Sequence, residues 1–192
     1  YIVYLSEGVN SRVASSALSR IDRLASRDAV VERLRVSGIY QFDLPDNSFD
    51  SVPFLGIVQL LEEVILQTKP SLIFTHFRHD LNIDHRLAFN AVLTAVRPQA
   101  GTSVKGIYSF EVPSSTEWAF NANDNFSPNY FVDISNFMEE KKSLLALYRA
   151  EMRDYPHPRS FENVESLARV RGATIGLIFA EGFSMIWSRD DL

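Results

Sequence analysis

The stretch that decides the fold is residues 71–97, which read S-L-I-F-T-H-F-R-H-D-L-N-I-D-H-R-L-A-F-N-A-V-L-T-A-V-R. Its apolar start, 71–75, predicts a buried strand, whereas residues 87–97 carry apolar side chains at helical spacing and stop before Pro98. Between them lies a polar segment that holds three histidines and two aspartates, namely His76, His79, His85, Asp80 and Asp84. A strand, a polar loop and a helix in this order are the repeating unit of a parallel α/β sheet.

The flanking sequence repeats this unit. We expect further strands at 1–5, 39–44 and 104–110, helices at 15–36, 54–68, 136–150 and 161–170, and a strand-like carboxyl end at 175–187. Alternating strands and helices imply parallel strands joined by right-handed crossovers. The sequence therefore predicts one α/β domain over residues 1–192, a Rossmann-like three-layer sandwich with a mostly parallel sheet.

Composition narrows the classes of protein to consider. With 192 residues, 46% of them hydrophobic, the chain can bury one core and does not require two domains. It has no cysteine, so any metal must be bound by His, Asp or Glu. The net charge of −5 disfavours a nucleic-acid partner. No membrane span or signal peptide is visible, so we expect a cytoplasmic protein, and the sequence leaves a homo-oligomer open.

Two segments, the predicted helix 15–36 and the loop 113–129, have a composition that predicts their surroundings or role. The arginines of the predicted helix 15–36 alternate with acidic residues, which is typical of a solvated helix face. Residues 113–129 are rich in Ser, Asn, Pro and Asp and are too long for a simple connection, so we expect a functional loop over the site.

The first residues, Y-I-V-Y-L at 1–5, are uncharged, β-branched and aromatic, which predicts a strand buried on both faces. Such a strand is unexpected at a free, charged amino terminus. We therefore expect the sequence to be a fragment that lacks an upstream segment; trimming of a short tail is the alternative.

The histidine-rich segment lies where open α/β sheets bind ligands, at the carboxyl end of a strand and the start of the next helix. Asn82 or Asp84 can cap that helix, which places His85 in its first turn. There the helix dipole disfavours imidazolium, so His85 keeps a lone pair for a metal, although a hydrogen-bonded surface histidine is the alternative. The residues close enough to act as ligand, base or supporting partner are Asp84, Asp80, His79 and His76.

This segment does not complete a metal site by itself. Zinc needs three or four protein ligands, and no second dense group of His, Asp and Glu follows. His157 stands alone in Y-P-H-P-R, where we favour a structural role over a catalytic one. The remaining ligands are therefore missing from the sequence.

L-N-I-D-H-R at 81–86, with the T-H at 75–76 before it, resembles the second motif of the PIG-L/LmbE-like family of zinc-dependent N-acetylglucosamine deacetylases. Other segments resemble the same family in the same order: Y-L-S-E-G-V-N-S-R (4–12), L-P-D-N (44–47), E-V-P-S-S-T-E-W (111–118), E-M-R-D-Y-P-H-P-R-S (151–160) and A-E-G-F (180–183). The family's first motif, A-H-P-D-D-E, supplies a histidine and an aspartate ligand and the aspartate base, and it is absent here. The resemblance implies that Tyr1 begins the family's second strand, so we expect the first strand of the fold, its motif and part of the helix after it to be missing from this sequence.

The resemblance also implies roles for individual residues. His85 resembles the third zinc ligand, and Asp84 the aspartate that hydrogen-bonds a neighbouring active-site group. Asn82 stands where several members have a histidine that polarises the substrate carbonyl or protonates the leaving amine. An amide can donate to an oxyanion but cannot deliver a proton, so the acid must be another group. The alternatives for that role are His76, His79 and His157.

Two further residues resemble substrate contacts. Arg12 resembles a loop arginine that meets anionic parts of the substrate, and Asp46 lies where some members bind a sugar hydroxyl; an ordinary surface charge is the alternative for each. The resemblance implies zinc-dependent hydrolysis of the N-acetyl amide of an N-acetylated amino sugar or glycoconjugate by the full-length protein, with the 192 residues alone inactive. The alternative is a non-catalytic, Rossmann-like sugar or nucleotide-sugar binding module.

Overall fold

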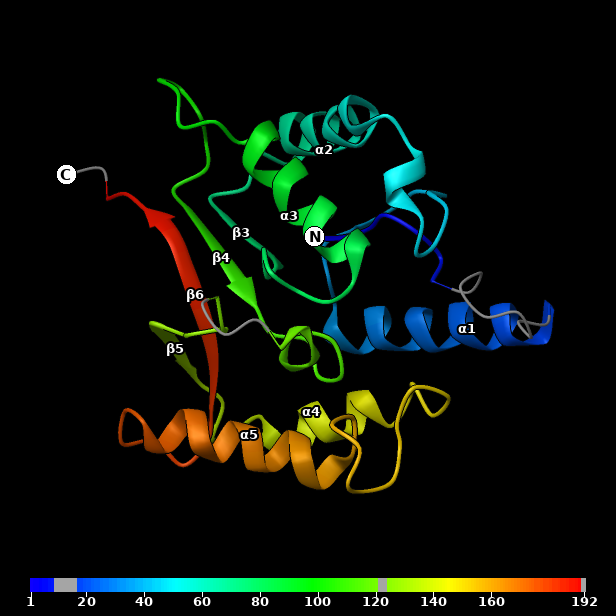
Figure 1. Cartoon of the computed structure of the whole chain (residues 1–192), viewed down its shortest axis with the longest axis vertical. Coiled ribbons are helices and arrows are strands. Elements are labelled where there is room, and N and C mark those ends of the chain that lie inside the picture. The colour runs from blue at the N-terminus through cyan, green and yellow to red at the C-terminus, as the bar shows by residue number, and fades with distance from the viewer. Residues whose placement is uncertain (9–16, 121–123, 191–192) are drawn as a thin grey trace.

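The computed structural model describes residues 1–8, 17–120 and 124–190 (Figure 1). The strands are β1 (Ile2–Tyr4), β2 (Ile39–Gln41), β3 (Leu72–His76), β4 (Gly106–Phe110), β5 (Tyr130–Asp133) and β6 (Ala180–Ser188). The helices are α1 (Ala17–Leu34), α2 (Phe54–Thr68), α3 (Ile83–Ala95), α4 (Met138–Leu145) and α5 (Phe161–Ala173), with single 3-10 turns at η1 (Phe49–Ser51) and η2 (Glu117–Ala119). The predicted strands and helices are present, and β5 is an additional strand that the sequence analysis missed, because it is short and largely exposed.

The described strands form two sheets, and no hydrogen bond between these two sheets is seen among the described residues. β1 and β2 are a parallel pair, and the second sheet has the order β3-β4-β6-β5. In that sheet β3 and β4 are parallel, whereas β6 runs antiparallel to both β4 and β5. The α/β, Rossmann-like prediction is confirmed, and the carboxyl-terminal strands make the sheet mixed.

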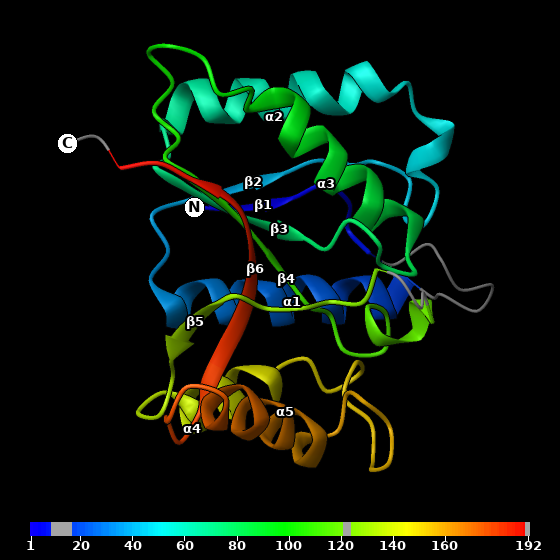
Figure 2. The ribbon, with the colours of Figure 1, turned by 60° about the vertical axis from the view of Figure 1, so that its left-hand side comes forward.

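The helices lie in two layers with the strands between them. α2 and α3 cover one face, and α1, α4 and α5 lie on the other (Figures 1 and 2). The main core joins the apolar stripes of α2 and α3 to β4, and its buried side chains are Phe49, Ile57, Val58, Leu61, Ala91, Val92, Val96, Val104 and Ile107. Among the described residues, no helix is both long enough and apolar enough to cross a membrane.

The strand at the start of the chain differs from its prediction. Residues 1–5 were expected to form a strand buried on both faces, but Ile2, Val3 and Tyr4 are only half-buried. Within the described part of the chain β1 pairs with β2 alone, and its other edge borders a cleft. The apolar sequence of β1 is therefore that of an interior strand, although its position here is at an edge.

Helix α3 shows how the local sequence sets the position of the site. It begins at Ile83, earlier than its apolar periodicity suggests, because the Asn82 side chain accepts a hydrogen bond from the backbone N–H of Asp84 at 2.8 Å. Of the two predicted capping residues, Asn82 is the one that caps. This cap places His85 in the first turn of the helix, as expected.

Candidate functional site

One cleft brings together most of the residues that the sequence singled out. It has a volume of about 1490 Å³ and is lined by His76 from the end of β3, by Asn82, Asp84 and His85 from the start of α3, and by Asp46 from the turn before η1. The cleft therefore opens at the carboxyl end of β3, where α/β sheets hold their ligands.

Asp80 fixes the orientation of His85. Its side chain is buried, with 1% of the residue exposed, and its Oδ1 lies 3.0 Å from Nδ1 of His85. Burial pushes the pKa of Asp80 up, but hydrogen bonds together outweigh burial and lower the pKa to about 2. An ionised carboxylate has no proton to donate, so Nδ1 of His85 must be the donor, and Nε2 keeps its lone pair. The other donors to Asp80 are the Asn82 backbone N–H and the hydroxyls of Ser115 and Thr116.

His76 packs against the face of His85. The two rings are stacked, with centroids 4.1 Å apart and planes at 20°, and Phe110 lies against the other side of His76 with the centroids 5.0 Å apart. Burial, followed by the neighbouring His85, lowers the pKa of His76 to about 3. His76 is therefore neutral near pH 7, which suits a packing role better than that of a proton donor.

Asp84 bonds to the backbone of the preceding turn. Its carboxylate accepts the N–H of Asn47 at 2.6 Å and the N–H of Phe49 at 2.9 Å. Burial raises the pKa of Asp84, the two backbone donors oppose this effect, and the charge of Asp46 adds to the rise. Asp84 thus fixes the turn against the start of α3, which differs from the contact with an active-site side chain that the resemblance implies.

Replacing Asp84 by alanine is expected to lower the free energy of unfolding by about 2 kcal/mol, because the buried Phe49 N–H loses its acceptor. Urea unfolding monitored by circular dichroism measures the change. The control is Asp50→Ala on the neighbouring turn, an exposed aspartate for which we expect less than about 0.5 kcal/mol. Equal effects in the two variants would contradict this role for Asp84.

The other predicted residues lie elsewhere. His157 accepts the backbone N–H of Arg159 at Nδ1, 3.0 Å away, and its ring meets the edge of Trp118 with centroids 5.6 Å apart. His79 places Nε2 3.5 Å from Oδ1 of Asp124. Neither histidine is among the described residues that line the cleft. Arg12 lies outside the described residues.

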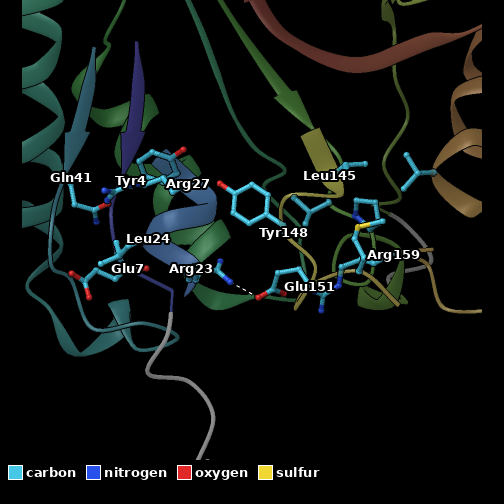
Figure 3. Close-up of a pocket in the computed structure, with 15 residues that line it drawn as sticks. Tyr4, Glu7, Arg23, Leu24, Arg27, Gln41, Leu145, Tyr148, Glu151 and Arg159 are labelled. Carbon is cyan, nitrogen blue, oxygen red and sulfur yellow. Dashed lines mark hydrogen bonds and ion pairs between the residues drawn. The ribbon is translucent and has the colours of Figure 1, made fainter. Parts of the chain in front are cut away.

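A smaller cavity of about 340 Å³ adjoins the cleft between α1 and the segment that follows α4 (Figure 3). Arg23 of α1 forms an ion pair with Glu151, and Glu151 also bonds Arg159 at 2.5 Å. The prediction of a solvated face for α1 is therefore wrong at Arg23. Because Arg23 and Glu151 are 128 residues apart, no local pattern in the sequence could indicate this contact.

Two side chains at the site were missed by the sequence analysis. Ser115 and Thr116 belong to the predicted functional loop 113–129, and both hydroxyls donate to Asp80. The segment 111–118 was noted only for its resemblance to the family. Hydroxyls next to each other after a strand were the available signal, but the sequence did not say which group they bond.

The described residues do not form a complete metal site. Among them, no group of three or more His, Asp or Glu side chains is arranged to hold a metal ion. His85 offers Nε2, but the carboxylate of Asp80 is engaged by His85, Ser115 and Thr116, and that of Asp84 by two backbone N–H groups. Of these three side chains, only that of His85 has an atom that could bind a metal and that no printed hydrogen bond engages among the described residues.

The chain matches the model of a known protein family. The model of the PIG-L family, described as GlcNAc-PI de-N-acetylase, matches residues 1–96, which is half of the 192-residue chain. No curated protein sequence matches the chain.

Several solved structures share the fold. N,N'-diacetylchitobiose deacetylase from Pyrococcus horikoshii, complexed with an inhibitor, has a TM-score of 0.73 and 17% identity over 97% of this chain and 72% of its own. The zinc-inhibited form of teicoplanin deacetylase Orf2 has a TM-score of 0.69 and 14% identity over 100% and 88%. GalB, the 4-carboxy-2-hydroxymuconate hydratase from Pseudomonas putida KT2440, has a TM-score of 0.70 and 19% identity over 99% and 85%. Deacetylases and a hydratase thus share one architecture, so the fold by itself does not fix the reaction.

Proposed function

The chain belongs to the PIG-L family, and we therefore propose that it is the core of a deacetylase that hydrolyses the N-acetyl amide of an N-acetylglucosamine-type sugar or glycoconjugate. Membership in a family described as a de-N-acetylase supports deacetylation in general. The observation that carries the proposal is His85, whose Nε2 is left with a lone pair at the carboxyl end of the parallel strands.

Asn82 supports the same reading of the cleft. Its Oδ1 is used to cap α3, which leaves its Nδ2 amide as the group that can donate. Asn82 lines the cleft together with His85, and we propose that this amide donates to an oxyanion that develops on a carbonyl bound there.

We also propose zinc as the metal, with Nε2 of His85 as one of its ligands. The family supports a metal, and one structural relative is named as a zinc-inhibited form. Because the described residues contribute one ligand and a zinc site needs three or four, the other ligands must come from elsewhere. We accordingly expect the 192-residue chain alone to retain no zinc and to turn over no substrate.

The cleft itself supports a second part of the proposal. Consecutive residues line it at 1–5, which include β1, and at 72–76, which form β3. A strand that turns one face to a cavity exposes alternate residues, whereas a strand that turns its edge exposes consecutive ones. β1 pairs only with β2 and β3 only with β4 among the described strands, so two edges with unpaired backbone groups border the same cleft.

We propose that in the active protein a further strand occupies this cleft between β1 and β3. The two bordering strands run in the same direction (Figure 2), so the inserted strand would be parallel to both and would join the two sheets into one. Its carboxyl end would then lie beside His85. Side chains that follow this strand would enter the candidate site.

Hydrogen–deuterium exchange tests this insertion. In the protein expressed from its complete reading frame, the amides of β1 and β3 should exchange at least about tenfold more slowly than in the 192-residue chain, because both edges become paired. The amides of β6, which is paired on both sides in either case, are the control. Unchanged exchange of β1 and β3 would contradict an inserted strand.

Zinc content and turnover test the function. The protein expressed from its complete reading frame should bind zinc and release both amine and acetate from N-acetylglucosamine derivatives, and a chelator should stop the release. Detection of both products separates hydrolysis from a hydration of the kind named for GalB. A folded protein with neither metal nor turnover on N-acetyl sugars would overturn the deacetylase proposal, and binding of N-acetylglucosamine by that protein would support the non-catalytic alternative.

A further inference from the structure

A buried carboxylate next to the cleft, that of Asp80, accepts four hydrogen bonds. Oδ1 of Asp80 accepts from Nδ1 of His85, from the Asn82 backbone N–H at 2.9 Å and from the Ser115 hydroxyl, and Oδ2 accepts from Oγ1 of Thr116 at 2.7 Å. The Thr116 hydroxyl also accepts the N–H of Val112 at 2.7 Å. Its proton is therefore directed at Asp80 alone.

The surrounding backbone holds this carboxylate in place. Nη1 of Arg86 donates to the carbonyls of Asp80 and Leu81, both at 2.7 Å, and the Leu81 N–H donates to the carbonyl of Ser115 at 3.4 Å. Three separate segments thus meet at Asp80: the loop after β3, the first turn of α3 and the loop after β4.

We infer that Asp80, clamped by Ser115 and Thr116, is the positioning residue for His85. It holds the His85 imidazole in its Nδ1–H tautomer and directs Nε2 into the cleft, while His76 stacks on the ring and blocks its rotation. The loop after β4, which carries Ser115 and Thr116, therefore acts on His85 through Asp80. Asp80 itself is not among the described residues that line the cleft. The use of this orientation in catalysis rests on the proposed deacetylase function, whereas the orientation itself does not.

Nitrogen-15 NMR of the imidazole rings tests the orientation without substrate or metal. The chain has four histidines, and His85→Gln identifies the signals of His85 by their loss. At about pH 8, where histidine is ordinarily neutral, His85 should show a protonated Nδ1 and an unprotonated Nε2. A wild-type spectrum with the proton on Nε2 of His85 overturns the inference, whatever the activity of the protein.

Two variants then separate positioning from mere structural support. Asp80→Ala removes the acceptor, so the Nδ1–H signal of His85 should give way to a tautomer mixture. Asp80→Asn retains an acceptor oxygen but loses the charge and the acceptor for Thr116, so it keeps the shape of the site if the alanine variant does not fold. In the active protein Asp80→Asn should lower kcat by about 10–100-fold while KM changes less than about threefold.

Asp50→Asn, an exposed aspartate on η1, is the matched control and should leave kcat unchanged. Unaltered kcat in Asp80→Asn would show that Asp80 only supports the fold, and would overturn its positioning role. If the protein proves to have no deacetylase activity at all, the NMR spectrum of the wild type still decides the orientation of His85. The activity assay thus tests the proposed function, and the NMR spectrum tests the orientation of His85 independently of it.

Discussion

Replacement of His85 by alanine in the protein expressed from its complete reading frame is expected to lower amine release from N-acetylated sugars by more than about a hundredfold and to remove most of the bound zinc. The reason is geometric. His85 lies in the first turn of α3, its Nδ1 is engaged by Asp80, and its Nε2 is available at the cleft. Alanine removes that nitrogen and leaves the helix cap at Asn82 in place.

The control for this variant is His79→Ala. His79 lies in the same loop, where it contacts Asp124 at 3.5 Å and packs edge-on against the ring of Phe77, but it is not among the described residues of the cleft. Its replacement should leave zinc content and kcat within about twofold of the wild type, as for a surface substitution away from the site. Equal losses in His79→Ala and His85→Ala, measured as metal content and amine release, would assign the effect to the loop as a whole and contradict a specific role for His85.

Replacement of Gly172 by alanine is expected to be strongly destabilising, by about 3 kcal/mol or more, because it overpacks a tight backbone contact. Gly172 is buried near the end of α5, where the chain turns back toward β6. A Cβ at this position would lie 2.7 Å from the carbonyl oxygen of Leu177 and 3.0 Å from the backbone of Ile178 and Phe179. Backbone atoms cannot move aside as a flexible side chain can, so the α5–β6 junction must open.

Gly56→Ala is the matched control, since it makes the same change in helix α2 at a position where an added Cβ meets nothing within 4 Å. There the loss of backbone freedom in the unfolded chain should stabilise the protein by up to about 1 kcal/mol. Urea unfolding of both variants measures the change in the free energy of unfolding, which should be a decrease for Gly172→Ala and an increase for Gly56→Ala. A Gly172→Ala variant as stable as the wild type would show that the turn after α5 is not packed as the structure describes.

The location of the candidate site could be predicted from the sequence, but the contacts between its side chains could not. The predicted strand at 71–75 and the helix after it identified the end of the sheet where the cleft opens, and the choice of Asn82 or Asp84 as cap placed His85 in the first turn. The roles of the neighbouring groups were not predictable. His76 stacks on His85, and Asp84 bonds two backbone N–H groups, because the turn before η1 and the end of β4 approach the start of α3 in space.

The amino-acid sequence by itself determined the helices, every strand except β5, the capped start of α3 and the family. These features depend on side-chain periodicity and on hydrogen bonds between residues a few positions apart, and both are visible in a short window of sequence. Only the tertiary structure decided that Ser115 and Thr116 clamp Asp80, 35 and 36 residues away, and that Arg23 pairs with Glu151. Such contacts form where the topology brings separate segments together, and the strength of a buried hydrogen bond depends on that arrangement rather than on any local pattern.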